Sequence, residues 1–280
     1  MRRMLMRLAA ALPLPFAHAA GWVLGWLMYT VSSRYRARLI ENLTLAGYGE
    51  DARVRHEAIA SAGCLLTELP ALWLRPHAKV TSLVREVEGL ELVRQAQAQG
   101  KGILFLTPHL GCFEISSQYG SQLFAMTVMF RPPKLAWLEP IMREGRERPG
   151  LRLATADLNG VRDLLFALKR QEAIGILPDQ VPGVGEGEWA AFFGKPAYTM
   201  TLAPRLIARK NVACFVAFAR RLPWGRGYTV SLRELDTLRP GESQTRRLNR
   251  CLEDVIRLCP GQYLWGYNRY KIPAGSKAPE

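Results

Sequence analysis

A histidine and a glutamate five residues apart are the first residues of this sequence whose types and spacing could do chemistry. His109 and Glu114 belong to Thr107-Pro-His-Leu-Gly-Cys-Phe-Glu114, which follows an apolar run at 102–107. On one helix their side chains would point about 140° apart, so they can meet only if His109 lies in a loop and Glu114 in the next helix's first turn. A carboxylate against one imidazole nitrogen leaves the other free to accept a proton. The pair is a candidate general-base dyad, and the alternative is a structural histidine capped by a neighbouring acid.

No rival catalytic or metal motif stands elsewhere in the sequence. It contains no H-E-x-x-H, no G-x-S-x-G and no Cys/His cluster at metal-ligand spacing, so a zinc site or a serine nucleophile is unsupported. The segment Gly183-Val-Gly-Glu-Gly187 lacks the Lys-Ser/Thr of a phosphate loop and indicates a flexible loop. The five cysteines are odd in number and include no C-x-x-C, which argues against a disulfide framework and favours a cytoplasmic body.

Short apolar runs that alternate with helical patterns predict an α/β domain around these residues. Buried strands are expected at 102–107, 125–130, 173–177 and 212–218, with an edge strand at 228–232. Helices are expected at 51–74, 89–99, 113–123, 138–147, 160–171, 199–209 and 243–258. This alternation is typical of a mixed, mainly parallel sheet flanked by helices. Ligands of such sheets gather at the carboxyl ends of strands, which is where His109 stands.

The beginning of the chain has the composition of a membrane-associated element. Residues 8–33 contain no Asp, Glu, Lys or Arg, and arginines flank them on both sides. Pro13 and Pro15 leave only 19–31 as unbroken apolar chain, shorter than the roughly 20 residues of a membrane span. We therefore expect a monotopic helix or hairpin with its arginines on anionic lipid phosphates. The aromatic residues expected at the headgroup level are Trp22, Trp26 and Tyr29.

Three alternatives stay open for this segment. A basic start and Ala17-His18-Ala19 resemble a secretory signal peptide with its cleavage site, and the other two are a full span and a buried core helix. On the favoured interpretation, residues 1–50 form an N-terminal membrane-associated helix with its basic flank, and residues 51–280 form the catalytic domain. No long linker separates the two, so the boundary near residue 50 is soft.

The net charge of the chain indicates which kinds of partner it could bind. The 280 residues include 38 Lys and Arg against 24 Asp and Glu, a formal charge of +14, which implies nucleic acid, anionic lipid or a phosphorylated substrate. Nucleic acid is disfavoured because the sequence has no recognised binding motif and no basic helix with stacking aromatics. With 49% hydrophobic and 22% charged residues the chain is neither disordered nor fibrous.

The H-x4-D/E pattern of His109 and Glu114 after an apolar strand resembles that of the glycerolipid acyltransferase superfamily. Further segments resemble one family within it, the lipid A late acyltransferases, which include lauroyl and myristoyl transferases. These segments are Phe130-Arg-Pro-Pro-Lys134, Gly160-Val-Arg-Asp-Leu-Leu-Phe-Ala-Leu-Lys169, Ile176-Leu-Pro-Asp-Gln180, Phe192-Phe-Gly-Lys-Pro-Ala-Tyr-Thr199 and Gln262-Tyr-Leu-Trp-Gly-Tyr-Asn-Arg-Tyr-Lys271. The apolar start followed by Arg36-Ala-Arg-Leu-Ile-Glu-Asn-Leu43 extends the resemblance over nearly the whole chain.

The resemblance implies an O-acyltransferase of lipopolysaccharide biosynthesis. Such an enzyme moves a fatty acyl chain from acyl-acyl carrier protein to a hydroxyl of a lipid A precursor at the cytoplasmic face of the inner membrane. His109 would deprotonate that hydroxyl, and Glu114 would orient the imidazole. The chemistry requires no metal, no cofactor and no covalent intermediate.

Four further residues are candidates for binding substrate. Arg131, in the family's R-P-x-K pattern with Lys134, would stabilise the oxyanion or bind a substrate phosphate, unless it forms a strand-end salt bridge. Asp179, in the D-Q pattern with Gln180, would hold Arg131 or a sugar hydroxyl, unless it is structural. The alternatives for the whole protein are an acyltransferase for a lysophospholipid or glycolipid, and a non-enzymatic protein that binds membrane lipid.

Overall fold

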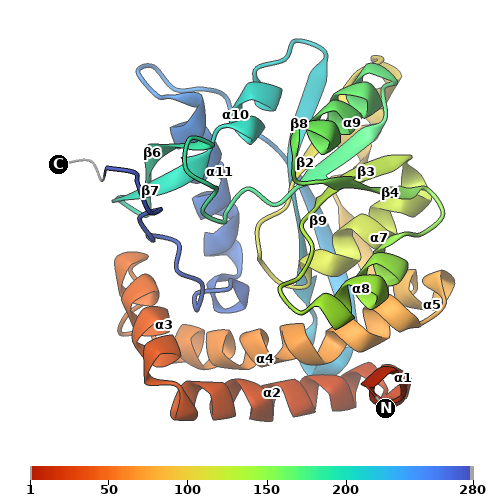
Figure 1. Cartoon of the computed structure of the whole chain (residues 1–280), viewed down its shortest axis with the longest axis vertical. Helices are drawn as coiled ribbons and strands as arrows, with labels where there is room; N and C mark the ends of the chain where they lie inside the picture. The colour runs from red at the N-terminus through yellow and green to blue at the C-terminus, as the bar shows by residue number, and fades with distance from the viewer. Residues whose placement is uncertain (1, 278–280) are drawn as a thin grey trace.

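A seven-stranded sheet forms the centre of the protein, for which a computed structural model describes residues 2–277 (Figure 1). The strand order is β1-β9-β8-β2-β5-β3-β4, and within the described chain every neighbouring pair is parallel except β8 with β9. The strands are β1 (Val84–Glu88), β2 (Gly102–Leu106), β3 (Met126–Phe130), β4 (Leu151–Thr155), β5 (Ala173–Ile176), β8 (Val212–Arg221) and β9 (Tyr228–Glu234). The predicted mixed, mainly parallel sheet is confirmed.

Helices cover both faces of this sheet. They are α1 (Arg2–Ala11), α2 (Leu14–Val31), α3 (Ser33–Leu45), α4 (Ala52–Leu74), α5 (His77–Thr81), α6 (Leu90–Ala98), α7 (Phe113–Leu123), α8 (Glu139–Arg146), α9 (Leu158–Lys169), α10 (Leu202–Ile207) and α11 (Gln244–Leu258), with single turns η1 (Ala136–Leu138), η2 (Pro223–Gly225) and η3 (Pro260–Gln262). Successive side chains of a strand point to opposite faces, so Leu104 packs in the core with α9, α10 and α11, and Phe105 in the core with α6, α7 and α8.

The structure differs from the expected arrangement of strands in several places. The strand predicted at 228–232 is not an edge, because β9 lies between β8 and β1. The sequence gives little sign of β1, since Val-Arg-Glu-Val-Glu is mostly polar. A small hairpin, β6 (Gly187–Phe192) and β7 (Lys195–Met200), occupies the start of the helix predicted at 199–209, which begins only at Leu202.

The N-terminal helices lie across one end of the molecule, side by side with α4 (Figure 1). Pro13 ends the first helical stretch, and the axes of α1 and α2 differ by 117°. Glycines bring α2 against α4, because a Cβ on Gly63 would overlap the carbonyl oxygen of Gly21. By length and composition, α4 or the bent pair of α1 and α2 could cross a membrane, although half of the α4 window is buried inside the protein.

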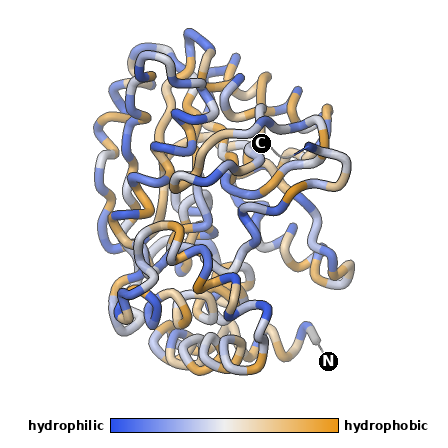
Figure 2. Tube along the Cα trace, turned by 90° about the vertical axis from the view of Figure 1, so that its left-hand side faces the viewer, coloured by the Kyte–Doolittle hydropathy of each residue, from blue (hydrophilic) through white to orange (hydrophobic). Residues whose placement is uncertain are grey.

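The surface that α1 and α2 turn away from the domain is apolar. Figure 2 shows hydrophobic segments along this end of the trace and α1 projecting from it. Of the aromatic residues expected at a membrane surface, Trp22 is exposed, whereas Trp26 and Tyr29 pack toward the domain core. The exposed large apolar residues of this surface are Met4, Leu5, Leu8, Leu12, Phe16, Trp22, Val23, Leu27 and Val31.

Candidate active site

The loop after β2 holds His109 in a fixed backbone position. Gly111 has a φ of +60°, and a Cβ there would overlap the Ala219 carbonyl, so the loop needs glycine at its closest approach to β8. The chain near residue 263 closes the other side, where the Gly111 amide donates to the Gln262 carbonyl at 2.9 Å and the Leu264 amide donates to the His109 carbonyl at 3.1 Å. As predicted, His109 lies in the loop and Glu114 in the first turn of α7.

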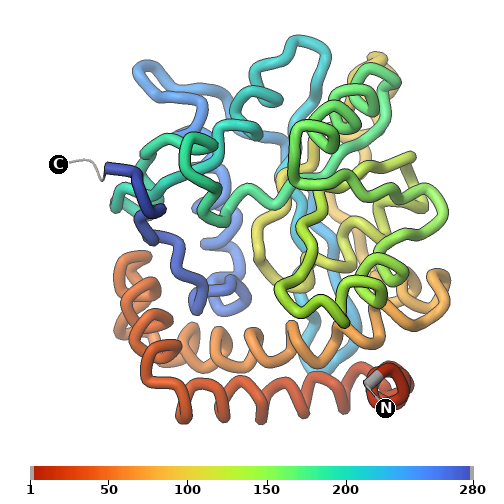
Figure 3. The backbone as a smooth tube through the Cα atoms, in the orientation of Figure 1, coloured from red at the N-terminus to blue at the C-terminus, as the bar shows by residue number. Residues whose placement is uncertain are grey.

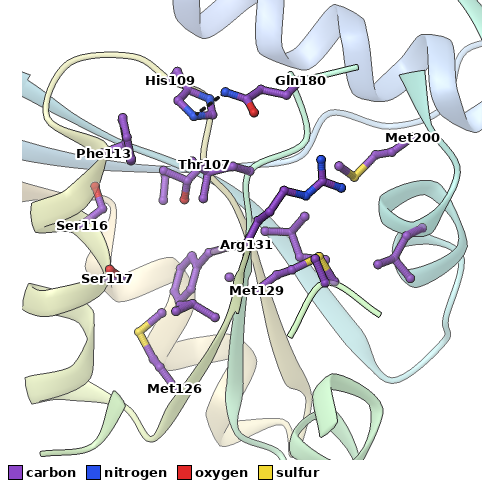
Figure 4. A pocket seen from close by; sticks show the side chains of 18 of the residues that line it. Thr107, His109, Phe113, Ser116, Ser117, Met126, Met129, Arg131, Gln180 and Met200 are labelled. Carbon is purple, nitrogen blue, oxygen red and sulfur yellow. Dashed lines mark hydrogen bonds between the residues drawn. The ribbon is translucent and has the colours of Figure 1, made fainter. Parts of the chain in front are cut away.

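Asp179 is the carboxylate that binds the imidazole. Its Oδ1 lies 2.8 Å from His109 Nδ1, and its Oδ2 accepts from the His109 amide at 2.8 Å. The Gln180 side-chain amide lies 3.1 Å from His109 Nε2 (Figure 4). An ionised Asp179 accepts the Nδ1 proton, which leaves Nε2 as the unprotonated nitrogen that can accept a proton. The geometry therefore holds the imidazole in an orientation in which it could act as a base.

The charge state of Asp179 suits this role. Burial acts to raise the pKa of the Asp179 carboxyl, but the electrostatic interaction with His109, the two hydrogen bonds from that residue and the Arg269 charge outweigh it and hold the pKa below its ordinary value. The carboxylate thus stays ionised at neutral pH although the side chain is only 2% exposed. Burial raises the pKa of the neighbouring Tyr263 phenol well above its usual range, so that group stays neutral.

Glu114 makes a different contact from the one that the sequence predicted. Instead of the imidazole, its carboxylate binds the Arg146 guanidinium through two hydrogen bonds and accepts a third from Trp73 Nε1 at 3.2 Å. The expected hydrogen bond to His109 was wrong because α7 turns this side chain toward α8 and α4, where an arginine competes for it. Glu114 is buried and still lines the cavity that His109 faces.

The other predicted binding residues lie in different surroundings. Arg131 follows β3 and extends into the cavity (Figure 4). Asp179 was expected to hold Arg131 or a sugar hydroxyl, but its oxygens are both engaged by His109. Gln180 lines the cavity beside the imidazole, whereas Lys134 is exposed and lies outside the cavity lining.

A cavity of about 770 Å³ opens at the carboxyl ends of β2, β3 and β5. One arm runs between α7 and the sheet, and it is mainly apolar. The residues that line it include Phe105, Phe113, Gly120, Phe124, Met126, Val128, Val230 and Leu232. The other arm lies on the opposite face of the sheet and carries the charged side chains Arg131, Asp157, Glu186 and Arg205 among apolar residues such as Met129 and Met200. Figure 4 shows His109 and Gln180 where the two arms meet.

Sequence reasoning missed the partnership of His109 with Asp179 and that of Glu114 with Arg146. A signal for the first existed, since both His109 and Asp179 directly follow predicted buried strands. What the sequence did not reveal is that β2 and β5 are neighbours in the sheet. Within residues 2–277 no group of three or more His, Cys, Asp or Glu side chains could hold a metal ion.

An imidazole oriented by a carboxylate beside a mainly apolar cavity is an arrangement that suits an enzyme whose substrate carries an aliphatic chain. The model of one family, described as bacterial lipid A biosynthesis acyltransferase, matches residues 2–272. The chain therefore belongs to the family of bacterial lipid A biosynthesis acyltransferases, as its motifs indicated.

Individual relatives agree with this assignment. The lipid A biosynthesis lauroyltransferase of Escherichia coli (strain K12) is 28% identical over 277 residues, which cover 94% of this chain and 88% of the relative. The lipid A biosynthesis palmitoleoyltransferase of the same organism is 27% identical over 276 residues, 95% of this chain and 89% of the relative. A lipid A biosynthesis acyltransferase of Haemophilus influenzae is 27% identical over 285 residues, 96% of this chain and 88% of the relative.

Proposed function

We propose that the protein transfers a fatty acyl chain from acyl-acyl carrier protein to a hydroxyl of a lipid A precursor, at the cytoplasmic face of the inner membrane. The observation that carries the proposal is the His109 imidazole, oriented by Asp179 at the junction of the two cavity arms. Family membership supports the acyl transfer and the lipid A acceptor.

In the proposed reaction His109 Nε2 removes the proton of the acceptor hydroxyl while its oxygen attacks the thioester carbonyl. Asp179 stabilises the imidazolium through Nδ1, and the proton then passes to the departing thiolate. Because the Gln180 amide occupies Nε2, the acceptor hydroxyl must displace it. The Arg131 guanidinium, already in the cavity, would stabilise the oxyanion or bind an acceptor phosphate.

The two arms suggest how the substrates share the cavity. The apolar arm beneath α7 suits the acyl chain of the donor, since burying each methylene contributes about 0.8 kcal/mol. The second arm suits the acceptor, because Arg131 and Arg205 could bind its phosphates. The Glu114 and Arg146 pair would act as a positioning contact that holds α7 against α8 and so shapes the first arm.

The N-terminal helices are proposed to lie on the membrane without crossing it. Their apolar outer surface, with Arg3, Arg7 and Arg34 exposed near its ends, has the composition of an interfacial element on anionic lipid. A cleaved signal peptide is disfavoured because Leu14 and Ala17 are buried in the folded protein. Residues 1–50 are therefore treated as a permanent part of the enzyme, with residues 51–280 as its acyltransferase domain.

The test is an assay of wild type and His109→Ala with a panel of acyl-acyl carrier proteins and a Kdo-lipid IVA type acceptor, with products read by mass. His56→Ala is the matched control, because His56 is exposed and outside the cavity lining. We expect wild type and His56→Ala to add one acyl chain to the acceptor, and His109→Ala to add none. Transfer to a lysophospholipid or glycolipid alone would overturn the acceptor, and undiminished transfer by His109→Ala would overturn the base.

A further inference from the structure

Trp224, at the tip of the turn between β8 and β9, is the most exposed of the large apolar side chains in the described chain, at 87%. We propose that this turn is a second membrane anchor, in which Trp224 inserts among the headgroups of an anionic bilayer beside the N-terminal helices. The inference extends the membrane surface of the proposed function to a segment about two hundred residues away in sequence, and it rests on that surface.

The backbone of Trp224 is held in a conformation that tryptophan rarely adopts. Its φ of 60° and ψ of 27° are left-handed, a region that favours glycine or asparagine. The Leu222 amide donates to the Gly227 carbonyl at 2.8 Å and closes the turn around it. The strained backbone raises the free energy of the folded chain, and the exposed indole makes almost no contact within the protein to offset that cost. We therefore infer that the indole gains its stabilising contact from a partner outside the chain.

The turn reaches the N-terminal helices. A Cβ on Gly225 would lie 2.5 Å from Pro15 Cα, so the backbone next to Trp224 is in contact with the start of α2. The exposed apolar side chains nearest to Pro15 in sequence are Leu12 and Phe16. Figure 3 shows the light-blue β8–β9 turn reaching the level of the red helices. The turn therefore continues the apolar surface of α1 and α2.

Charge favours lipid as the occupant of this surface. Arg226 follows the turn, and its carbonyl accepts a hydrogen bond from Arg85 Nε at 3.0 Å, so two exposed arginines lie at the base of the turn. Neither arginine forms an ion pair within residues 2–277. An indole tip above a pair of arginines matches the interface between acyl chains and anionic phosphates.

Vesicle binding of the full chain tests the proposal. Wild type, Trp224→Ala, Trp224→Gly and Trp224→Phe are sedimented with vesicles of phosphatidylethanolamine and phosphatidylglycerol. The matched control is Phe166→Ala, an exposed aromatic residue of α9 on the side of the second cavity arm. Alanine and glycine should each weaken partitioning about tenfold, phenylalanine should retain most of it, and the control should bind as wild type.

Thermal unfolding separates anchoring from a structural role. Because glycine adopts a positive φ without strain, Trp224→Gly should be at least as stable as wild type while it binds vesicles less well. Unchanged vesicle binding by both Trp224→Ala and Trp224→Gly would overturn the anchor, as would a loss of binding that merely follows a loss of stability.

Activity separates the anchor from the proposed reaction. With acceptor in detergent micelles Trp224→Ala should turn over as wild type, and with acceptor in vesicles it should be slower. An enzyme that acylates no acceptor but loses vesicle binding in Trp224→Ala would keep the anchor and overturn the proposed reaction. If wild type acylates the acceptor in micelles but does not bind vesicles, the proposed reaction would stand and the membrane anchor would be overturned.

Discussion

His109 Nδ1 lies 2.8 Å from Asp179 Oδ1, although the two residues are 70 positions apart in the chain. The contact exists because β2 and β5 are parallel neighbours, so the loops that follow them meet at one edge of the sheet. The second Asp179 oxygen accepts from the His109 amide, so one carboxylate fixes both the ring and its backbone. The orientation of the His109 imidazole thus depends on Asp179 rather than on Glu114.

Asp179→Asn should lower kcat by about 10²- to 10⁴-fold, because an amide favours the wrong tautomer and cannot stabilise the imidazolium. The KM for the acyl donor should change little, because this carboxylate contacts His109 and not the apolar arm. Steady-state kinetics with a soluble acyl donor checks both values. Equal kcat losses in Asp179→Asn and Glu114→Gln would contradict the assignment of the orienting residue.

Arg146→Met should destabilise the fold by about 3–5 kcal/mol, because it leaves the buried Glu114 carboxylate without its cation. The double variant Arg146→Met with Glu114→Gln should recover much of this loss. Urea unfolding gives the free energies. Arg143→Met is the control one turn away, since its partners Glu139 and Glu147 are more than a third exposed and the cost there should stay below about 1 kcal/mol.

Gly120→Ala should shift donor selection toward shorter acyl chains. A Cβ at this position would lie 2.6 Å from Met126 Sδ, so the methionine must move within the apolar arm that both residues line. Each methylene that no longer fits should cost about fourfold in kcat/KM. Competition between acyl-acyl carrier proteins of different length measures the shift, and an unchanged preference would place the acyl chain elsewhere.

Acid should unfold the protein partly through Glu68. This carboxylate is fully buried and binds Arg221 through hydrogen bonds of 2.5 and 3.0 Å, with Tyr228 OH at 3.1 Å. Burial acts to raise its pKa, but the Arg221 charge and the hydrogen bonds of His18 and Arg221 lower it from 4.5 to about 2.

A lowered pKa gives stability that is complete above about pH 4.5 and is lost as the pH falls toward 2. The full loss should amount to about 3 kcal/mol below pH 2, and about 2 kcal/mol of it should be lost by pH 3. Denaturant unfolding at pH 7, 5 and 3 should show this decline in wild type and a flatter dependence in Glu68→Gln, which is less stable at pH 7. If the free energy of unfolding falls equally with pH in wild type and in Glu68→Gln, Glu68 is not the cause of the acid sensitivity.

The parts of the fold that could be predicted are those with a strong local pattern. The run at 102–107 and Gly111 place His109 in a loop at the end of a strand, as the structure has it. The partner of the imidazole could not be chosen in this way, because the sequence pattern does not report that β2 lies beside β5. Likewise Arg146 reaches Glu114 from a separate helix, and no spacing rule connects them.

The strands that were missed have a related explanation. β1 carries Arg85, Glu86 and Glu88, so its sequence looks like a solvated turn, and only pairing with β9 makes it a strand. β4 (Leu151–Thr155) is likewise short and half polar. The β6–β7 hairpin is stabilised from outside, since Asn249 of α11 donates to the Ala191 carbonyl at 3.0 Å.

The segment that closes the His109 loop has a consequence for protein synthesis. Leu264 binds the His109 carbonyl, Tyr267 accepts from the Val181 amide at 2.9 Å, and Asn42 donates to the Trp265 carbonyl at 2.6 Å. These contacts join the segments of Asn42, His109 and Val181, which are distant in sequence. The residues that join them, 264–267, leave the ribosome after all three segments. A nascent chain would therefore expose the apolar helices α1 and α2 long before residues 262–267 could close the His109 loop. If α1 and α2 bind the membrane as proposed, the order of translation would let the chain reach the membrane before its proposed base is assembled.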